Sequence, residues 1–217
     1  MYQLPRYQDA DAAAVMEFMK SHPFVTLIGV GEDGSPVATQ VPILLREEAG
    51  TILLRGHIMR QSDHYLAFAK NPAALVLFTG PHAYISASWY EDPAQASTWN
   101  YMTVQAKGRL VLLDDHALLP MLQELTDHYE PEGSSPAAFS QLPEEYLIRL
   151  SKAIAGFEIR VDSLQHVFKL SQNRDANSFQ HILSQLEKGS DDARAIAAEM
   201  RKRQAGLFPI SGKQAAR

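Results

Sequence analysis

The stretch GPHAYISASWYEDPAQASTWNY, residues 80–101, is the part of the chain around which we organise the rest. It contains both tryptophans and three of the eight tyrosines, so it is the main aromatic concentration of the sequence. Large aromatic side chains normally make core or interface contacts, and a buried Trp N–H or Tyr O–H needs a polar partner. Short hydrogen-bonding side chains lie close by. Two interpretations stand: a strand pair whose aromatics fill the core, or the wall of a pocket for a planar polar ligand.

The composition bounds the class of protein. The chain has 217 residues, of which 46% are hydrophobic, and this suits one large domain or one domain with a helical appendage. No apolar run approaches the ~20 residues of a membrane helix, and the N-terminus lacks the pattern of a secretory signal. The absence of cysteine excludes disulfides, thiolate metal sites and a Cys nucleophile, and fits a reducing cytoplasm. The net charge of −5 gives no general attraction to nucleic acid or to anionic lipid.

Most of the chain up to residue 114 predicts strands. Asp33-Gly34 indicates a hairpin turn, Pro42 an edge position or a bulge, and Gly108 a bulge or bend. A second turn is expected over 46–51, and Ser62 or Asp63 is expected to cap a short helix that ends at Asn71-Pro72. The strand candidates are 24–31, 36–45, 51–58, 73–80, 83–90 and 100–114, with Gly80-Pro81 as a turn. An antiparallel meander without βαβ alternation favours a small closed barrel.

The remaining segments are mainly helical. Asp9 is expected to cap a helix that runs to about His22, where Pro23 stops it. The later elements expected are helices at 114–130, 143–152 (with Pro143 in the first turn), 176–188 and 191–204, a loop at 131–139, a strand at 153–164 and a frayed tail at 210–217. We therefore predict an α+β, mainly β domain over residues 1–175, followed by C-terminal helices and a tail over 176–217.

The sequence contains no strong metal or nucleophile motif. Its eight histidines form no HxH, HExxH or helically spaced pair with a carboxylate, so no metal site is predicted. Ser86 lies in ISASW without the glycines of a nucleophile elbow. The final helix has Arg194, Arg201, Lys202 and Arg203, but acidic residues are interspersed, so a solvated helix is favoured over a DNA-recognition helix.

Two segments have donors suited to a ligand. GHIMRQSD, residues 56–63, runs from a strand end into a helix start, and Arg60 and Ser62 supply the cation and hydroxyl that a phosphate needs there. KLSQN, residues 169–173, with Arg174, clusters donors after a strand, and its amides can match an amide-like ring. The structural alternatives are a surface arginine beside an N-cap serine and a polar strand-to-helix turn.

Together these stretches resemble the PaiB-type, FMN-binding negative transcriptional regulators. The shared marks span roughly residues 1–175 in the family's order. They are MYQLPRY, HPFVTLI, VPILL, GH followed by Arg60, GPHAYISASWY, TWNY with Val104 and Gly108, IAGFEI and KLSQNR. The chain differs from the usual pattern at Met59, Ser62 and Ala87.

The resemblance implies a flavin-reductase-like, antiparallel split β-barrel with peripheral helices, and a homodimer that holds FMN between the barrels of two subunits. It implies that the phosphate meets His57, Arg60, Gln61 and Ser62. It further implies that the flavin ring lies near two groups of residues: Ser86, Trp99 and Asn100, and Lys169, Gln172 and Asn173.

Three functions follow from this resemblance and fold. The first is an FMN-binding transcriptional regulator of the PaiB type. The second is an FMN-dependent oxidoreductase, in which flavin would carry the hydride or electron chemistry. The third is a haem-handling protein, because haem-utilisation proteins share the split barrel. The acidic balance argues against direct, specific binding to duplex DNA, and fold alone does not separate the three functions.

Overall fold

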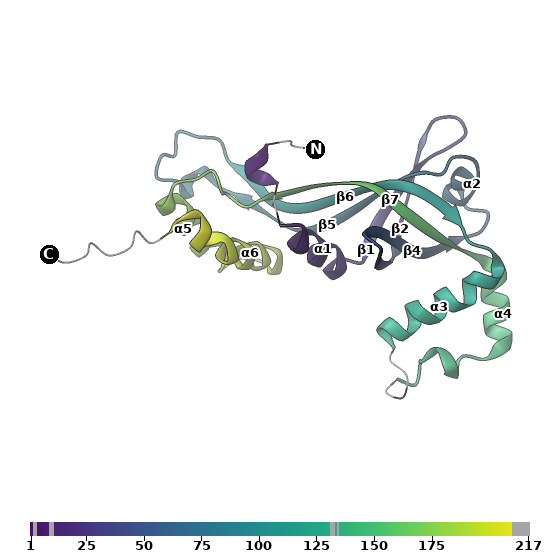
Figure 1. Cartoon of the computed structure of the whole chain (residues 1–217). Coiled ribbons are helices and arrows are strands. Elements are labelled where there is room, and N and C mark those ends of the chain that lie inside the picture. Colours follow the sequence, from purple (N-terminus) through teal and green to yellow (C-terminus); the bar gives the residue numbers. More distant parts are fainter. Residues whose placement is uncertain (2–3, 9–10, 131–132, 134, 210–217) are drawn as a thin grey trace. The chain divides into compact units, whose positions relative to one another are not determined.

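The computed structural model describes residues 1, 4–8, 11–130, 133 and 135–209 (Figure 1). The chain divides into two compact units, which we describe separately. The first unit comprises Met1–Val15, Thr79–Thr103 and His166–Arg217. The second comprises Met16–Phe78 and Val104–Gln165. The boundary predicted at residue 175 stays a prediction.

The described residues form one seven-stranded sheet, and each of its strands lies wholly or partly in the second unit. The order of hydrogen-bonded neighbours is β2-β1-β5-β6-β7-β4-β3. The registered pairs β1–β2, β1–β5, β3–β4 and β4–β7 are all antiparallel. The strands are β1 Phe24–Val30, β2 Pro36–Pro42, β3 Leu44–Glu48, β4 Thr51–Met59, β5 Ala73–Ile85, β6 Thr98–Leu112 and β7 Ile154–Lys169.

Two tight turns set the register of the hairpins. The β1–β2 turn is confirmed: Gly34 has φ 82°, and the Gly31 N–H donates to the Ser35 carbonyl at 2.7 Å. The β3–β4 turn is shorter than expected, because the strands reach Glu48 and Thr51. Ala49 and Gly50 both have positive φ, 47° and 78°, as a two-residue type I′ turn requires.

The segment predicted as one return strand over 36–45 is two strands. β2 ends at Pro42, β3 begins at Leu44, and the Ile43 N–H between them donates to the Pro23 carbonyl at 2.9 Å. β2 and β3 stand at opposite ends of the strand order, so the edge position expected of Pro42 is confirmed. The chain therefore passes from one end of the sheet to the other within a single residue.

The predicted turn at Gly80-Pro81 is wrong, because β5 runs unbroken through it. The registered pairing of β5 with β1 ends at Leu77, so Pro81 costs no hydrogen bond of that ladder. The expected strand 83–90 is the end of β5 followed by a 3₁₀ turn, Ala87–Trp89. Likewise, the strand expected at 153–164 extends to Lys169 as β7, whose 16 residues exceed the 15 of β6.

The helices follow the predicted order with small shifts at their ends. Ser62, Asp114, Asp175 and Ser190 each accept a backbone hydrogen bond as N-caps. Pro143 occupies the N-cap rather than the first turn. The helices are α1 Ala12–Ser21, α2 Asp63–Lys70, α3 Asp115–Tyr129, α4 Glu144–Ala153, α5 Ala176–Leu186 and α6 Asp191–Leu207. The predicted Asp9 cap, part of the 131–139 loop and the 210–217 tail lie outside the described residues.

Each unit has its own buried apolar side chains. In the second unit the strands contribute fully buried residues, and α3 and α4 add a smaller cluster at the start of β7 (Figure 1). In the first unit α5 and α6 pack together and bury Phe179, Ile182 and Ile196. Within the described ranges, every helix is too short or too polar to cross a membrane.

Gly108 has its explanation in a close approach of two strands of the second unit. A Cβ at this position would lie 2.1 Å from the Arg160 carbonyl oxygen of β7, a distance that the backbone cannot accommodate without shifting. In contrast, a Cβ on Gly206 in α6 would meet nothing within 4 Å.

Gly108→Ala should therefore destabilise the protein by about 3 kcal/mol or more, because added volume in a packed backbone contact forces the strands apart. Gly206→Ala should be neutral or stabilise by about 0.5 kcal/mol, because alanine loses less backbone entropy in a helix. Denaturant unfolding of the two variants beside the parent measures both effects. Equal stabilities would contradict the contact at Gly108.

Candidate functional site

The predicted phosphate segment forms the turn between β4 and α2 in the second unit. Gln61 adopts a left-handed conformation with φ 64°, and Ser62 is extended. The Ser62 hydroxyl accepts the Tyr65 N–H at 3.3 Å and donates to the Met59 carbonyl at 2.7 Å. Ser62 is thus the predicted N-cap of α2, and the hydrogen of its hydroxyl is already in use.

Arg60 ties this turn to the neighbouring elements. Its Nε donates to the Ile154 carbonyl at 2.7 Å, its backbone N–H donates to the Ala153 carbonyl, and its Nη2 pairs with the Asp115 carboxylate. The Arg60 side chain is 29% exposed, whereas that of Asp115 is 78% exposed. Arg60 therefore joins the end of β4 to the α4–β7 junction and to the start of α3, and its carboxylate partner is largely exposed.

His57 lies on β4 opposite Gly156 of β7. Its Nδ1 is buried and has no hydrogen-bond partner among the described residues. Burial lowers the pKa of His57 below its ordinary value, so its imidazole is neutral near pH 7. His57 can therefore offer a neutral hydrogen-bonding group but no positive charge.

The first unit contains a polar pocket of about 400 Å³. Three of the predicted ring residues, Asn100, Lys169 and Asn173, line it together with Arg174. The other lining residues are Tyr7, Gln95, Ala96, Ser97, Thr98 and Ser171. Two cations and several hydroxyl and amide groups line this pocket without a carboxylate, so its surroundings favour an anionic or electron-rich ligand.

Both cations of the pocket are held in place by uncharged groups. Lys169 donates through Nζ to the Thr98 hydroxyl, and Arg174 stacks on the Tyr90 ring at 3.8 Å while it donates to Gln95. Desolvation and, to a smaller extent, the charge of Arg174 lower the pKa of Lys169. Neither cation has an acidic partner within the described part of the chain. We grouped Arg174 with KLSQN from the sequence, but the residues that the family resemblance assigns to the flavin ring do not include it.

Asn100 and Gln172 use their amides internally. Asn100 is fully buried; its side-chain N–H donates to Ser171 Oγ at 3.0 Å, and the Ser171 hydroxyl lies 3.2 Å from Asn100 Oδ1. Gln172 donates to the Phe168 carbonyl at 2.5 Å and accepts the Leu170 N–H at 2.6 Å. These bonds hold the left-handed turn at Ser171, whose φ is 63°. Both amides therefore position the segment that carries Lys169.

The aromatic stretch divides between the two interpretations. Tyr90 is buried, whereas Trp99 is 51% exposed and meets Tyr84 edge-on at 5.7 Å between ring centroids. His82 lies beside Trp99 at 5.8 Å with its ring tilted by 42°, so the three exposed rings form an aromatic cluster on the first unit. Ser86 caps the 3₁₀ turn and shares a 2.8 Å hydrogen bond with the Ser88 hydroxyl.

Comparison with solved structures finds proteins of similar fold. The FAD and haem binding protein from Mycobacterium smegmatis is similar, with a TM-score of 0.58 at 19% identity, over 80% of this chain and 78% of that one. The flavocytochrome Anf3 from Azotobacter vinelandii gives 0.59 at 15% identity, over 77% of this chain and 72% of that one. These likenesses confirm the predicted fold: mainly β, antiparallel, of the split-barrel type with peripheral helices.

Sequence comparison then identifies the family. Residues 1–163 match the model of the "Putative FMN-binding domain" family. The protease synthase and sporulation protein PAI 2 of Bacillus subtilis is 30% identical over 198 residues, which are 91% of this chain and 95% of that protein. The chain belongs to this FMN-binding family, of the PaiB type. The predicted family and its cofactor, FMN, are confirmed at this level.

The Asn100–Ser171 pair should contribute to stability independently of any ligand. Asn100→Ala should cost about 2 kcal/mol of folding free energy, because the buried Ser171 hydroxyl loses its partner. A double-mutant cycle with Ser171→Ala should give a coupling energy of about 1 kcal/mol, because the residues bond each other. Denaturant unfolding in the absence of FMN measures both values. Additive losses would show that the two side chains act separately.

Proposed function

We propose that this PaiB-type protein binds FMN with its phosphate at the turn between β4 and α2. The observation that supports the phosphate position is the combination of Arg60, the left-handed Gln61 and the start of α2 within four residues of chain. The start of α2 contributes the positive end of the helix dipole, which favours a phosphate, although the N–H groups of His64 and Tyr65 are already bonded to the Asp63 and Ser62 side chains. His57 and Ser62 would complete the polar surroundings. Bound FMN would supply hydride or electron transfer.

The contacts of Arg60 are compatible with this role. Its carboxylate partner, Asp115, is 78% exposed, and exposed ion pairs contribute only about 0–1 kcal/mol. A phosphate dianion makes stronger, charge-assisted bonds with a guanidinium, so it would outcompete Asp115. Asp63 opposes the phosphate, because its carboxylate already lies in the first turn of α2.

For the flavin ring we propose contacts from the first unit of the other subunit, since the family resemblance implies that FMN lies between two subunits. Lys169 and Asn173 line its pocket and would bind the polar edge of the ring, with Arg174 adding positive charge. Trp99 and Ser86 would supply a flat apolar surface and a hydroxyl. Asn100 and Gln172 would hold this segment in place rather than bind the ring, because their amides are bonded internally.

We further propose that the protein is cytoplasmic and a homodimer, the assembly that the family resemblance implies. Sedimentation velocity of the FMN-loaded protein tests the homodimer directly.

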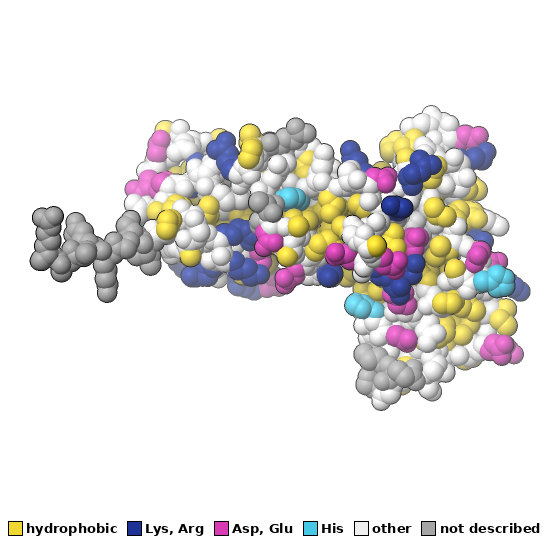
Figure 2. Space-filling view, viewed as in Figure 1, with side chains coloured by type: hydrophobic (Ala, Val, Ile, Leu, Met, Phe, Trp, Pro, Cys, Tyr) yellow, Lys and Arg dark blue, Asp and Glu magenta, His cyan; other side chains and the backbone are white. Residues whose placement is uncertain are grey.

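We do not propose specific binding to duplex DNA. The net charge is −5, and basic and acidic side chains are interspersed on the face shown in Figure 2. A specific, salt-resistant gel shift at nanomolar protein would contradict this and favour direct transcriptional regulation.

The role of Arg60 is tested by two variants that should not weaken FMN binding together. Arg60→Ala should weaken FMN binding at least several-fold, because a charge-assisted phosphate contact contributes about 1.5–3 kcal/mol. Asp115→Asn should leave FMN affinity unchanged or raise it, because it removes the internal competitor for the same guanidinium. Fluorescence titration with FMN measures both.

Arg160→Ala is the matched control, since Arg160 is an exposed arginine of the same unit that forms no ion pair with any described residue. A purely structural Arg60 would give a different pattern. Arg60→Ala and Asp115→Asn would then lower stability together, and FMN affinity would stay at the parent level in both.

Lys169→Met should weaken FMN binding several-fold, because it removes the charge from the pocket of the first unit while it retains most of the apolar stem. Lys188→Met, at an exposed position of the same unit, should have no effect. The absorbance maxima of bound FMN provide a second readout, because a charge beside the ring alters its electronic spectrum. Unchanged affinity and spectrum in Lys169→Met would refute the ring position.

A further inference from the structure

The polar pocket of the first unit carries more positive charge than a flavin ring requires. Its cations are Lys169 and Arg174, and none of its described lining residues is acidic. An oxidised flavin ring is uncharged, and we propose the phosphate of FMN at the turn between β4 and α2. A ring in this pocket therefore leaves both cations without an opposite charge. A cation that is partly removed from water is stabilised by an anionic partner, so a second, negative group is expected here.

The two cations of the pocket are fixed by different groups. Lys169 donates to the Thr98 hydroxyl at the start of β6. Arg174 donates to the side chain of Gln95, in the loop before β6, and its guanidinium lies 3.8 Å from the centre of the buried Tyr90 ring. Because their partners differ, Lys169 can serve the flavin ring while Arg174 serves another group.

Most of the donors of Arg174 are available to a ligand. Within the described part of the chain only its Nη1 forms a hydrogen bond, so the Nε and Nη2 edge is unused. The adjacent Asp175 carboxylate caps α5 instead of pairing with the guanidinium. Stacking on Tyr90 holds the guanidinium in place, so a ligand orders little that is not already ordered. Such a planar fork binds a carboxylate at two points.

The hydroxyl groups of the lining favour the same ligand chemistry. Ser97 Oγ accepts the Ala87 N–H at 3.0 Å, and Thr98 Oγ1 accepts from Lys169. Neither hydroxyl donates to a described residue, so the hydrogen of each remains available. A ligand group that meets these hydroxyls must accept hydrogen bonds, as a carboxylate oxygen does and an ammonium group cannot.

We propose that the pocket of the first unit binds a small organic carboxylate beside the flavin ring, with Arg174 as its anchor. This inference rests on the ring position proposed above. Arg174 would bind the two carboxylate oxygens through Nε and Nη2, and Ser97 would donate to one of them. Lys169 would stay with the polar edge of the ring. The single charge and the two coplanar oxygens of a carboxylate match one guanidinium.

Benzoate and benzamide test the proposal, because they are similar in size and shape but only benzoate is charged near pH 7. Calorimetric titration of the full chain saturated with FMN should show binding of benzoate that saturates below about 10 mM. Benzamide should bind about tenfold more weakly, because it lacks the charge-assisted contact. Equal binding of the two probes, or no saturation by benzoate, would overturn the proposal.

A second measurement asks whether benzoate and FMN occupy the pocket together. The affinity for FMN, measured by fluorescence titration, should not fall when benzoate is present, because binding couplings are reciprocal and the two ligands have separate anchors. Competition between benzoate and FMN would refute the proposal, since both cations would then serve one ligand.

Two substitutions identify the anchor, and both are titrated at saturating FMN so that a change in FMN affinity does not enter. Arg174→Lys keeps the charge but loses the planar fork, so it should weaken benzoate binding about tenfold. Arg174→Met should abolish the preference for benzoate over benzamide. Arg194→Lys is the matched control, because Arg194 is an exposed arginine of the same unit that pairs with Asp191 and does not line the pocket. Parent-level benzoate binding in Arg174→Met would refute the anchor.

The ring position and the carboxylate site fail in different ways. Unchanged FMN affinity and spectrum in Lys169→Met would refute the ring position, whatever benzoate does. A normal effect of Lys169→Met without any preference for benzoate would refute only the carboxylate site. Thermal unfolding checks that each Arg174 variant is folded, and the comparison of the two probes on the parent chain remains decisive if one is not.

Discussion

The passage from β2 to β3 through one residue, Ile43, is the constraint on which the second unit depends. These strands stand at opposite ends of the strand order, yet their adjacent ends are consecutive in the chain. The two ends of the sheet must therefore approach each other. Gly56 of β4 shows how closely they do so, because a Cβ there would lie 2.9 Å from the Pro42 carbonyl oxygen. A flat, open sheet is incompatible with this connection, whereas a closed antiparallel one accommodates it.

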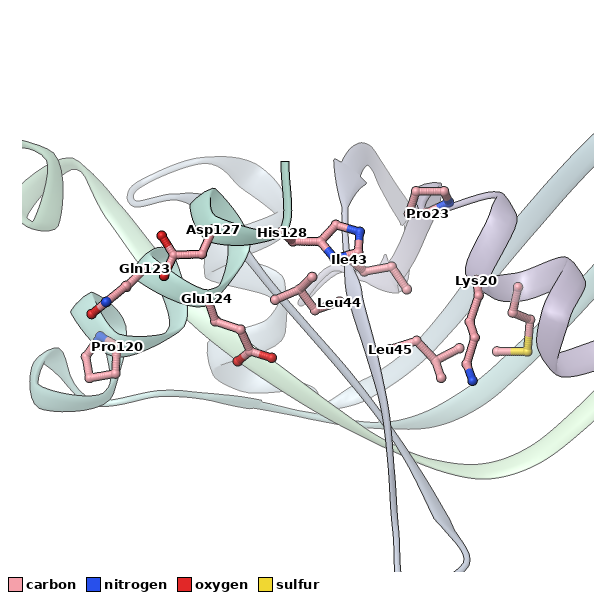
Figure 3. A pocket seen from close by; sticks show the side chains of 11 residues that line it. Lys20, Pro23, Ile43, Leu44, Leu45, Pro120, Gln123, Glu124, Asp127 and His128 are labelled. Atoms are coloured by element: carbon pink, nitrogen blue, oxygen red, sulfur yellow. The ribbon is translucent and has the colours of Figure 1, made fainter. Parts of the chain in front are cut away.

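This connection also determines what surrounds it. Residues that follow Ile43 are brought under α3, where Arg46 binds Glu124 and fixes one helix face over the β2–β3 junction. The apolar floor of the pocket drawn in Figure 3 is therefore a consequence of how the sheet closes. In the middle of the same sheet, Gly108 lets β6 approach β7 more closely than any side chain would permit.

The sequence predicts what is decided locally. The Asp33-Gly34 turn and the Ser62 cap depend on residues within four positions of each other, and both are present. The turn predicted at Gly80-Pro81 is wrong, because a proline interrupts a strand only where a neighbouring strand would accept a hydrogen bond from the N–H that proline lacks. Asn100 could not be recognised as a buried structural amide, since its partner Ser171 is 71 residues away. Family motifs compensated for this in part: they placed Lys169 and Asn173 together, but they gave no indication that Asn100 and Gln172 are already bonded.

The contacts of Arg60 with the chain need not exclude the contact with a phosphate that we propose. Its Nε bond to the Ile154 carbonyl orients the guanidinium, while its Nη2 is paired with an acid that is largely in water. An exposed pair contributes about 0–1 kcal/mol, so breaking it weakens phosphate binding by about fivefold at most. A guanidinium left without any partner would instead have to lose rotamer freedom when the ligand arrives. An orienting carbonyl with a weak, replaceable carboxylate is therefore a better arrangement for a phosphate ligand than a free arginine would be.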